Sequence, residues 1–193
     1  MLASARDLFT AQGYPATSLA AVAQQAAVSP DTIYKAFGTK LGLLRALMQQ
    51  AVGGDDQDVP MLDREQPQAM RAEPDQRRQI AMFAAGMTGQ LERLRPIDDI
   101  LAGAAAVDPA AAQLRQHIQN DERREAMRTV AGWIAARGPL REGLTRADAG
   151  AAIWALTSPE VHRMLRDVNG WSARRYERWL ADTLTTSLLP APA

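Results

Sequence analysis

The stretch Thr17–Leu44, TSLAAVAQQAAVSPDTIYKAFGTKLGLL, decides the fold of this chain. Its apolar residues follow helical spacing in two short segments, and Ala27-Val28 forms a tight turn between them. Ser29 can cap the second segment, and Pro30 stands at its first position, where the amide hydrogen that proline lacks would have no partner. A helix pair of this kind, with small polar residues opening the second helix, is typical of proteins that insert a helix into the DNA major groove. The stretch therefore predicts a helix-turn-helix.

The second of these helices carries side chains that can read a DNA groove. Small residues at its start, Ser29, Pro30 and Asp31, allow the backbone to approach the bases. Thr32 can hydrogen-bond a base edge or press its methyl group against that of a thymine. Lys35 lies one turn after Asp31 and Thr32, on the face that we expect to be exposed.

Residues around this helix can contact phosphates. The Tyr34 hydroxyl can reach one phosphate, and the Lys40 ammonium, at the start of the next helix, can bind another. The hydroxyls of Thr17 and Ser18, with the amides of the helix that follows them, offer a further phosphate site. The alternative is a purely structural role, with Tyr34 as a core tyrosine and Lys40 as a solvated lysine. Spacing alone leaves both interpretations open.

The rest of the chain predicts further helices. The first helix ends at Gly13 and Pro15, and a fourth begins at about Lys40 and ends at Gly53. Residues 55–75 are acidic, contain three prolines and form a connector with room for one short helix. Beyond the connector, apolar spacing, caps and a break at Pro96 delimit further helices, at 75–94, 97–106, 109–137, 145–157, 159–166 and 172–188.

Composition limits the class of protein. Of 193 residues, 47% are hydrophobic and 5% aromatic, and alanine is abundant, which favours an all-α fold. No apolar run approaches the ~20 residues that span a bilayer, and no export signal is apparent, so we expect a cytoplasmic protein without membrane contact. The chain has no cysteine, its two histidines lack metal-ligand spacing, and no phosphate-binding loop occurs. We therefore expect no enzyme activity, no cofactor and no metal.

The N-terminal segment has a small positive charge. Residues 1–52 carry four cations and two anions, a net charge of plus two. This is little for a DNA-binding domain, because neutralised phosphates supply much of the affinity, but a dimer would double it. The small charge keeps open a second hypothesis, a helical interaction module that has lost DNA binding.

Residues from about Leu8 to Leu47 resemble the DNA-binding domain of the TetR family of bacterial repressors. The matching segments are LFTAQGY, TSLAAVAQQAAVS and TIYKAFGTKLGLL. Their apolar positions, the Thr-Ile-Tyr, the phenylalanine before the turn and the lysine after it all fall at family spacing. The rest of the chain resembles the family in length, helical content and element order.

The resemblance implies a homodimeric transcriptional regulator, usually a repressor, that a small-molecule effector releases from a palindromic double-stranded DNA operator. An N-terminal three-helix domain, residues 1–52, would bind the operator. A larger helical domain, 53–193, would dimerise and hold the effector pocket. Carried over by position, Thr17, Ser18, Tyr34 and Lys40 would contact phosphates. Ser29 to Thr32 and Lys35 would read the groove.

Two further sets of residues are candidates within the larger domain. An apolar effector would be bound by aromatic, methionine and histidine side chains, namely Met82, Phe83, Met87, His117, Trp133 and Trp154. The last helix and the helix at 145–157 would form a four-helix dimer interface, with Trp154, Tyr176, Trp179, Leu180 and Leu184. For both sets the alternative is intramolecular core.

The sequence departs from the family pattern at three places. Ala27 stands where the family usually has glycine, and a left-handed conformation there would cost alanine roughly 1 kcal/mol. Asp31 brings a carboxylate near the phosphates, which would weaken non-specific binding, although it could accept from a cytosine amino group. Relatives usually carry an often basic arm before the first helix, which is here either trimmed or lacking.

Overall fold

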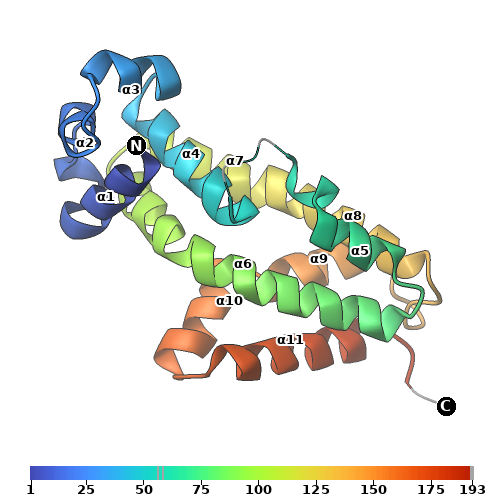
Figure 1. The fold of residues 1–193 in the computed structure, drawn as a ribbon. Coiled ribbons are helices and arrows are strands. Elements are labelled where there is room, and N and C mark those ends of the chain that lie inside the picture. Colours follow the sequence, from blue (N-terminus) through green and yellow to red (C-terminus); the bar gives the residue numbers. More distant parts are fainter. Residues whose placement is uncertain (56, 58, 192–193) are drawn as a thin grey trace. The chain divides into compact units, whose positions relative to one another are not determined.

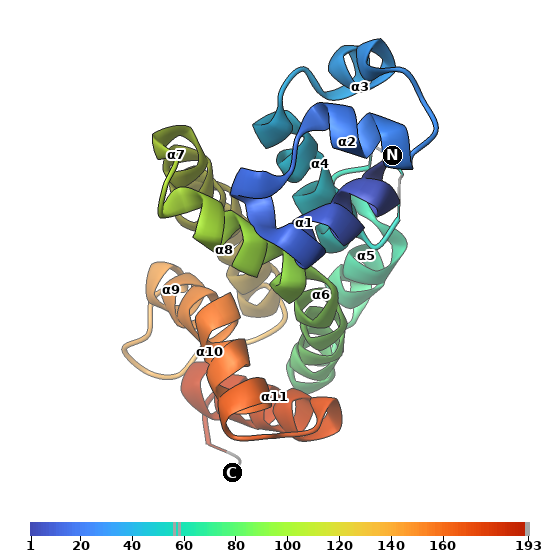
Figure 2. The same ribbon diagram turned by 90° about the vertical axis from the view of Figure 1, so that its left-hand side faces the viewer.

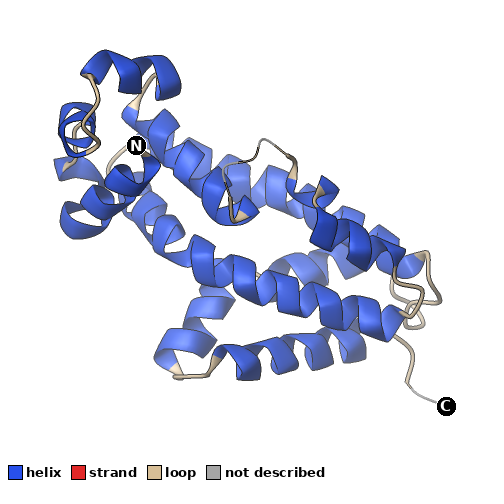
Figure 3. Ribbon diagram, in the orientation of Figure 1, coloured by secondary structure: helices blue, strands red, loops and turns tan. Residues whose placement is uncertain are grey.

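The computed structural model describes residues 1–55, 57 and 59–191, and this part of the chain forms helices and loops without a strand (Figures 1 and 3). The α-helices are α1 (Leu2–Ala16), α2 (Leu19–Gln25), α3 (Pro30–Phe37), α4 (Lys40–Gly53), α5 (Glu65–Ala72), α6 (Gln76–Ala105), α7 (Pro109–His117), α8 (Arg123–Ala135), α9 (Arg146–Leu156), α10 (Pro159–Arg163) and α11 (Ala173–Leu188). A 3-10 turn, η1 (Met61–Asp63), and two π-helical segments, η2 (Ile118–Glu122) and η3 (Met164–Val168), complete the list. The all-α fold class is as predicted.

The chain divides into two compact units. The first comprises Met1–Gln57 and Glu92–His117, and the second comprises Asp58–Leu91 and Ile118–Ala193. Helix α6 therefore supplies its first part to the second unit and its last part to the first. The domain boundary expected after residue 52 assumes that each domain is one continuous segment. The first compact unit also includes residues 92–117.

Polar caps fix the starts of the short helices in the first unit. The Ser18 hydroxyl accepts from the Ala21 amide at 3.1 Å, and the Thr39 hydroxyl accepts from the Gly42 amide at 2.9 Å. Each bond satisfies one of the amides that a helix start leaves without a partner. The apolar faces that these caps orient are buried together, with side chains from all four helices, namely Ala5, Phe9, Val22, Ile33, Leu43 and Leu47.

The turn between α2 and α3 has the left-handed residue that the family resemblance implies. Ala27 has a φ of 53°, and it is the one non-glycine residue with a positive φ in the described part of the chain. The Val28 amide donates to the Ala23 carbonyl at 3.0 Å, which closes the turn. Alanine adopts this conformation at a cost of roughly 1 kcal/mol, because its Cβ crowds the following carbonyl.

The break expected at Pro96 is wrong, because α6 runs through it. The residues on either side, Leu94, Ile97 and Leu101, are at most 5% exposed. Burying such side chains contributes roughly 1.5–3 kcal/mol each, whereas a proline inside a helix costs about 3 kcal/mol. The burial outweighs the lost hydrogen bond, so the helix continues.

Two helices expected to be regular contain π-helical segments instead. The helix predicted over 109–137 is divided into α7, η2 and α8, and the helix predicted over 159–166 becomes α10 and η3. A π-helical turn inserts an extra residue per turn and is frequent at functional sites. Hydrophobic spacing does not reveal such an insertion over a single turn.

The second unit is built on the close pairing of α8 and α9, followed in the chain by α10 and α11 (Figure 2). Gly150 on α9 makes this pairing possible, because a Cβ there would lie 3.1 Å from the Arg128 Cα. A capping box between Thr145 and Asp148 starts α9 where the sequence predicts. All four tryptophans of the chain, Trp133, Trp154, Trp171 and Trp179, belong to this unit.

Ala27→Gly tests the strain in the turn. We expect the variant to raise the free energy of unfolding by up to about 1 kcal/mol, because glycine adopts a positive φ without crowding. Ala26→Gly is the matched control, since Ala26 has a φ of −82° and gains nothing from glycine. Urea unfolding in which Ala27→Gly is as destabilising as Ala26→Gly would contradict a strained turn.

Candidate nucleic-acid interface

The start of α3 presents small polar groups to solvent. Ser29 caps the helix, its hydroxyl accepting from the Thr32 amide at 3.2 Å, and the two hydroxyls lie 2.9 Å apart. Pro30 occupies the first turn, as predicted. Ser29, Pro30, Asp31 and Thr32 are all exposed. These residues have the size and chemistry that approach to base edges requires.

Tyr34 and Lys35 extend this exposed face by one turn. Tyr34 is 56% exposed, so its alternative role as a core tyrosine is wrong. Lys35 is also exposed. Between them and the core lies Ile33, which is fully buried and anchors α3 on the first unit. The helix therefore has one anchored side and one side that presents hydroxyl, phenol and ammonium groups to solvent.

The two residues before α2 differ in their surroundings. Ser18 is exposed, and its hydroxyl caps the helix. Thr17 is only 1% exposed, and its hydroxyl donates to the Gly13 carbonyl at 2.9 Å while it accepts from the Gln12 amide at 3.3 Å. The Thr17 side chain thus offers no donor to solvent, and it is left out of the DNA contacts proposed below.

Lys40 connects the start of α4 to the end of α1. Its Nζ atom donates to the carbonyls of Tyr14 at 2.8 Å and Pro15 at 3.4 Å, and lies 4.3 Å from the centre of the Tyr14 ring. The alternative of a freely solvated lysine is therefore wrong. An ammonium has three N–H donors, so two carbonyls leave one for a phosphate.

Tyr14 and Asp108 support this connection, and the sequence analysis did not single them out. Tyr14 is 7% exposed, and its ring stacks on Phe9 at 5.7 Å between centres. Burial, then the charge of Asp108 and a hydrogen bond to its side chain, raise the pKa of Tyr14 above its ordinary value. Tyr14 and Asp108 lie far apart in sequence, so no local pattern could have revealed the pair.

The candidate effector residues do not all fall in one unit. His117 is exposed and belongs to the first unit, whereas the other five belong to the second. Phe83 and Met87 are buried, and Met82 is half-buried. Two of the candidates are tryptophans. The Arg71 guanidinium carbon lies 5.6 Å from the centre of the Trp133 ring, and the Trp154 indole donates to the Gln119 carbonyl at 2.8 Å.

Three of the residues expected at a dimer interface are core residues. Tyr176, Leu180 and Leu184 have no exposed surface in the single chain. The apolar stripe of α11 is therefore used within the chain, and the intramolecular alternative holds for these three. Trp154 and Trp179 are half-buried, so each retains surface that a partner could cover.

The family comparison agrees with this geometry. Residues 1–47 match the family model described as bacterial regulatory proteins of the tetR family. Residues 1–47 are therefore similar to the N-terminal domain of the TetR family. No curated protein is similar enough to this sequence to match it.

Solved structures of bacterial transcriptional regulators, one of them described as a TetR-family regulator, share the fold over nearly the whole chain. NalD, the secondary repressor of the MexAB-OprM multidrug efflux pump in Pseudomonas aeruginosa, is 22% identical with a TM-score of 0.69, covering 99% of this chain and 94% of its own. PfmR of Thermus thermophilus is also 22% identical, with a TM-score of 0.65 and 98% of both chains covered. A protein of Saccharomonospora viridis described as a transcriptional regulator, solved with choline, is 16% identical, with a TM-score of 0.68 and coverage of 98% and 96%.

The described residues lack the features of two other kinds of site. No described helix has the length and apolar character needed to cross a membrane. The same residues contain no cluster of three or more histidine, cysteine, aspartate or glutamate side chains that could hold a metal ion.

Replacement of Lys40 tests how much its contacts with Tyr14 and Pro15 contribute to the stability of the protein. We expect Lys40→Met to lower the free energy of unfolding by about 1–2 kcal/mol, because the Tyr14 and Pro15 carbonyls lose a charged donor. Lys35→Met removes the same charge from an exposed position and should leave stability within about 0.5 kcal/mol of the original. Equal thermal denaturation midpoints for the two variants would show that Lys40 does not hold α1 to α4.

Proposed function

We propose that this protein is a homodimeric transcriptional regulator of the TetR type, a repressor that a small molecule releases from a palindromic operator. The observation that carries the DNA-binding part is the exposed face of α3, where Thr32, Tyr34 and Lys35 surround a capped helix start. Such a face on an anchored helix matches what a recognition helix requires.

The proposed contacts fall into two groups. Ser29, Pro30, Asp31, Thr32 and Lys35 face the groove, where Thr32 and Lys35 offer groups that distinguish bases. Ser18, Tyr34 and the remaining donor of Lys40 bind phosphates, which positions the helix without reading sequence. Asp31 opposes the phosphate charge, so we expect it to weaken binding to unrelated DNA more than binding to an operator.

A dimer is proposed because one copy has little charge for the task. Residues 1–52 have a net charge of plus two, which two copies would double. A twofold dimer would also present two α3 helices to the half-sites of a palindrome. The partly exposed Trp154 and Trp179 are the residues that we expect at the dimer surface.

DNA binding is tested by fluorescence anisotropy on short duplexes tiled across the region upstream of the protein's own gene. We expect two copies per duplex and one preferred duplex. Thr32→Val should lower the preference for that duplex about tenfold, because it removes a base-reading hydroxyl and keeps the side-chain shape. Tyr34→Phe should weaken binding to all duplexes alike, because a phosphate contact carries no sequence information.

Arg78→Gln is the control, since Arg78 is 77% exposed on α6 and pairs with Glu73 rather than lying on α3. It should leave affinity within twofold. Absence of binding to every duplex at low salt would contradict the proposal and favour the interaction module.

The repressor and effector parts are proposed by analogy with the structural relatives. NalD is a repressor, and the Saccharomonospora viridis protein was solved with choline. We propose that an effector shifts the population between a DNA-competent and an incompetent arrangement of the two recognition helices. Met82, Phe83, Met87, Trp133 and Trp154 remain the proposed apolar contacts.

A buried polar cluster in the second unit supports an effector site near Trp154. Arg123 donates to the Trp154 carbonyl and to the Thr157 hydroxyl, and its guanidinium lies 5.4 Å from the centre of the Trp154 ring. The fully buried Tyr176 packs edge-on against the His162 ring at 4.8 Å. Its hydroxyl has no hydrogen-bond partner among the described residues, and burial strongly raises its pKa. Because buried polar groups are nearly always bonded, this hydroxyl is a candidate to bind an effector.

Tyr176→Phe tests whether the hydroxyl is unsatisfied in the free protein. We expect the variant to be as stable as the original or up to about 1 kcal/mol more stable, because it loses a buried hydroxyl that has no partner. Tyr14→Phe is the matched control, since it loses the hydrogen bond to Asp108 and should be less stable. If Tyr176→Phe loses more than about 1 kcal/mol in urea unfolding, the hydroxyl is already bonded.

A further inference from the structure

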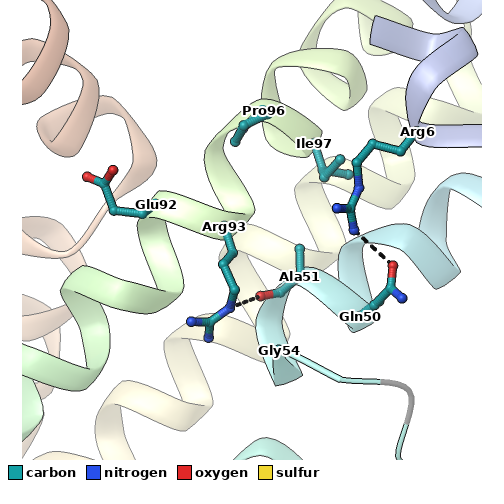
Figure 4. A pocket seen from close by; sticks show the side chains of 8 residues that line it. All are labelled: Arg6, Gln50, Ala51, Gly54, Glu92, Arg93, Pro96 and Ile97. Atoms are coloured by element: carbon teal, nitrogen blue, oxygen red, sulfur yellow. Dashed lines mark hydrogen bonds between the residues drawn. The ribbon is translucent and has the colours of Figure 1, made fainter. Parts of the chain in front are cut away.

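A pocket of about 430 Å³ lies within the first unit, bordered by α1, α4 and α6 (Figure 4). Arg6 comes from α1, Gln50 and Ala51 come from α4, and Arg93 and Ile97 come from α6. None of the residues proposed to contact DNA lines this pocket. It is therefore separate from the exposed face of α3.

Arg93 is held at the pocket in a way that leaves most of its donors unused. Its Nε atom donates to the Ala51 carbonyl, in the last turn of α4, at 3.2 Å. In Figure 4 its two terminal nitrogens point away from Ala51. No hydrogen bond or ion pair joins these nitrogens to another residue in the part of the chain that the structure describes. A guanidinium fixed through Nε offers a planar pair of donors that matches the two oxygens of a carboxylate.

The residue after α4 makes room for this arrangement. Gly54 has a φ of 84°, and a Cβ there would lie 3.3 Å from the Cζ and Nε atoms of Arg93. Any other residue would have to adopt a strained backbone and press against the guanidinium. Gly54 thus allows Arg93 to lie against the end of α4.

A second guanidinium stands on the other side of Ala51. The Arg6 Nη2 atom donates to the Gln50 side-chain oxygen at 3.0 Å, which orients both groups (Figure 4). Among the described lining residues the acidic one is Glu92, which directs its carboxylate away from both arginines (Figure 4). The described lining residues thus carry two cations against one distant anion, a positive balance that favours an anionic ligand.

The remaining lining is apolar. Ala51 and Ile97 are 3% and 1% exposed, so the accessible apolar surface of the lining comes mainly from the exposed Pro96. The Pro96 ring can contact a carbon skeleton but offers nothing to a second charge. The chemistry of the lining therefore suits a molecule with one anionic end and a short apolar body.

We propose that this pocket binds a small organic monocarboxylate. The carboxylate receives hydrogen bonds from the terminal nitrogens of Arg93, and Arg6 contributes positive charge from the opposite side. The body of the ligand lies against the Pro96 ring. This site lies outside the residues proposed to contact the effector, and its binding does not depend on DNA.

Isothermal titration calorimetry of the full chain without DNA tests the site, with sodium benzoate as the probe. Benzamide has the same ring without the charge, and sodium phosphate has charge without the ring. We expect saturable binding of one benzoate per chain, and at least tenfold weaker binding of benzamide and phosphate. Arg93→Gln should weaken benzoate binding about tenfold or more, because it removes a charged donor pair.

Two further variants keep the result interpretable. Arg6→Gln should weaken benzoate binding several-fold, and since Arg6 is an exposed residue its loss should not affect folding. Arg78→Gln changes the charge of α6 outside the pocket and should leave the affinity within twofold. Circular dichroism melts verify that each variant is folded.

Two kinds of result would contradict the proposal. The site would be overturned if benzoate showed no saturable binding. It would also be overturned if Arg6→Gln and Arg93→Gln both bound benzoate with the affinity of the unmodified chain. Phosphate binding as tight as benzoate would overturn the carboxylate assignment. Since no DNA is present, none of these results depends on the proposed function.

Discussion

The burial of one face of α6 is the constraint on which both units depend. Its first part supplies Ile80, Phe83 and Leu91 to the second unit, and its last part supplies Leu94 and Leu101 to the first. All five side chains are less than 9% exposed. The apolar face continues past Pro96, so the helix persists where local propensity would end it. Neither unit has a complete core without this helix.

Local signals predicted the parts of the fold that depend on neighbouring residues. Ser18, Ser29, Thr145 and Ser172 each cap a helix through the side-chain oxygen, as their positions suggest. The left-handed Ala27 was expected from the family resemblance, because this turn position usually has glycine in the family. Each capping bond spans three residues, which a single sequence displays directly.

The features that could not be predicted from the sequence depend on packing between residues far apart in the chain. The π-helical segments η2 and η3 break no pattern of apolar spacing, so they looked like regular helix. The stripe on α11 correctly indicated burial, but periodicity does not say whether the covering surface is the same chain or a partner. The contact between Lys40 and Tyr14 spans 26 positions, and nothing near either residue indicates it. At the candidate interface, Tyr34 is exposed and so is not a core residue, whereas the burial of Thr17 is the reason that it is left out of the proposed contacts.

The location of the tryptophans allows the two units to be distinguished by fluorescence. All four tryptophans belong to the second unit, and the aromatic residues of the first unit are tyrosines and phenylalanines, among them Tyr14 and Tyr34. Emission excited at the red edge of the tryptophan band therefore reports the second unit alone, whereas backbone ellipticity reports both. Superimposable melting curves from the two signals would mean that α6 couples the units into one cooperative transition. Separate curves would mean that each unit melts by itself, and they would give the order in which the units are lost.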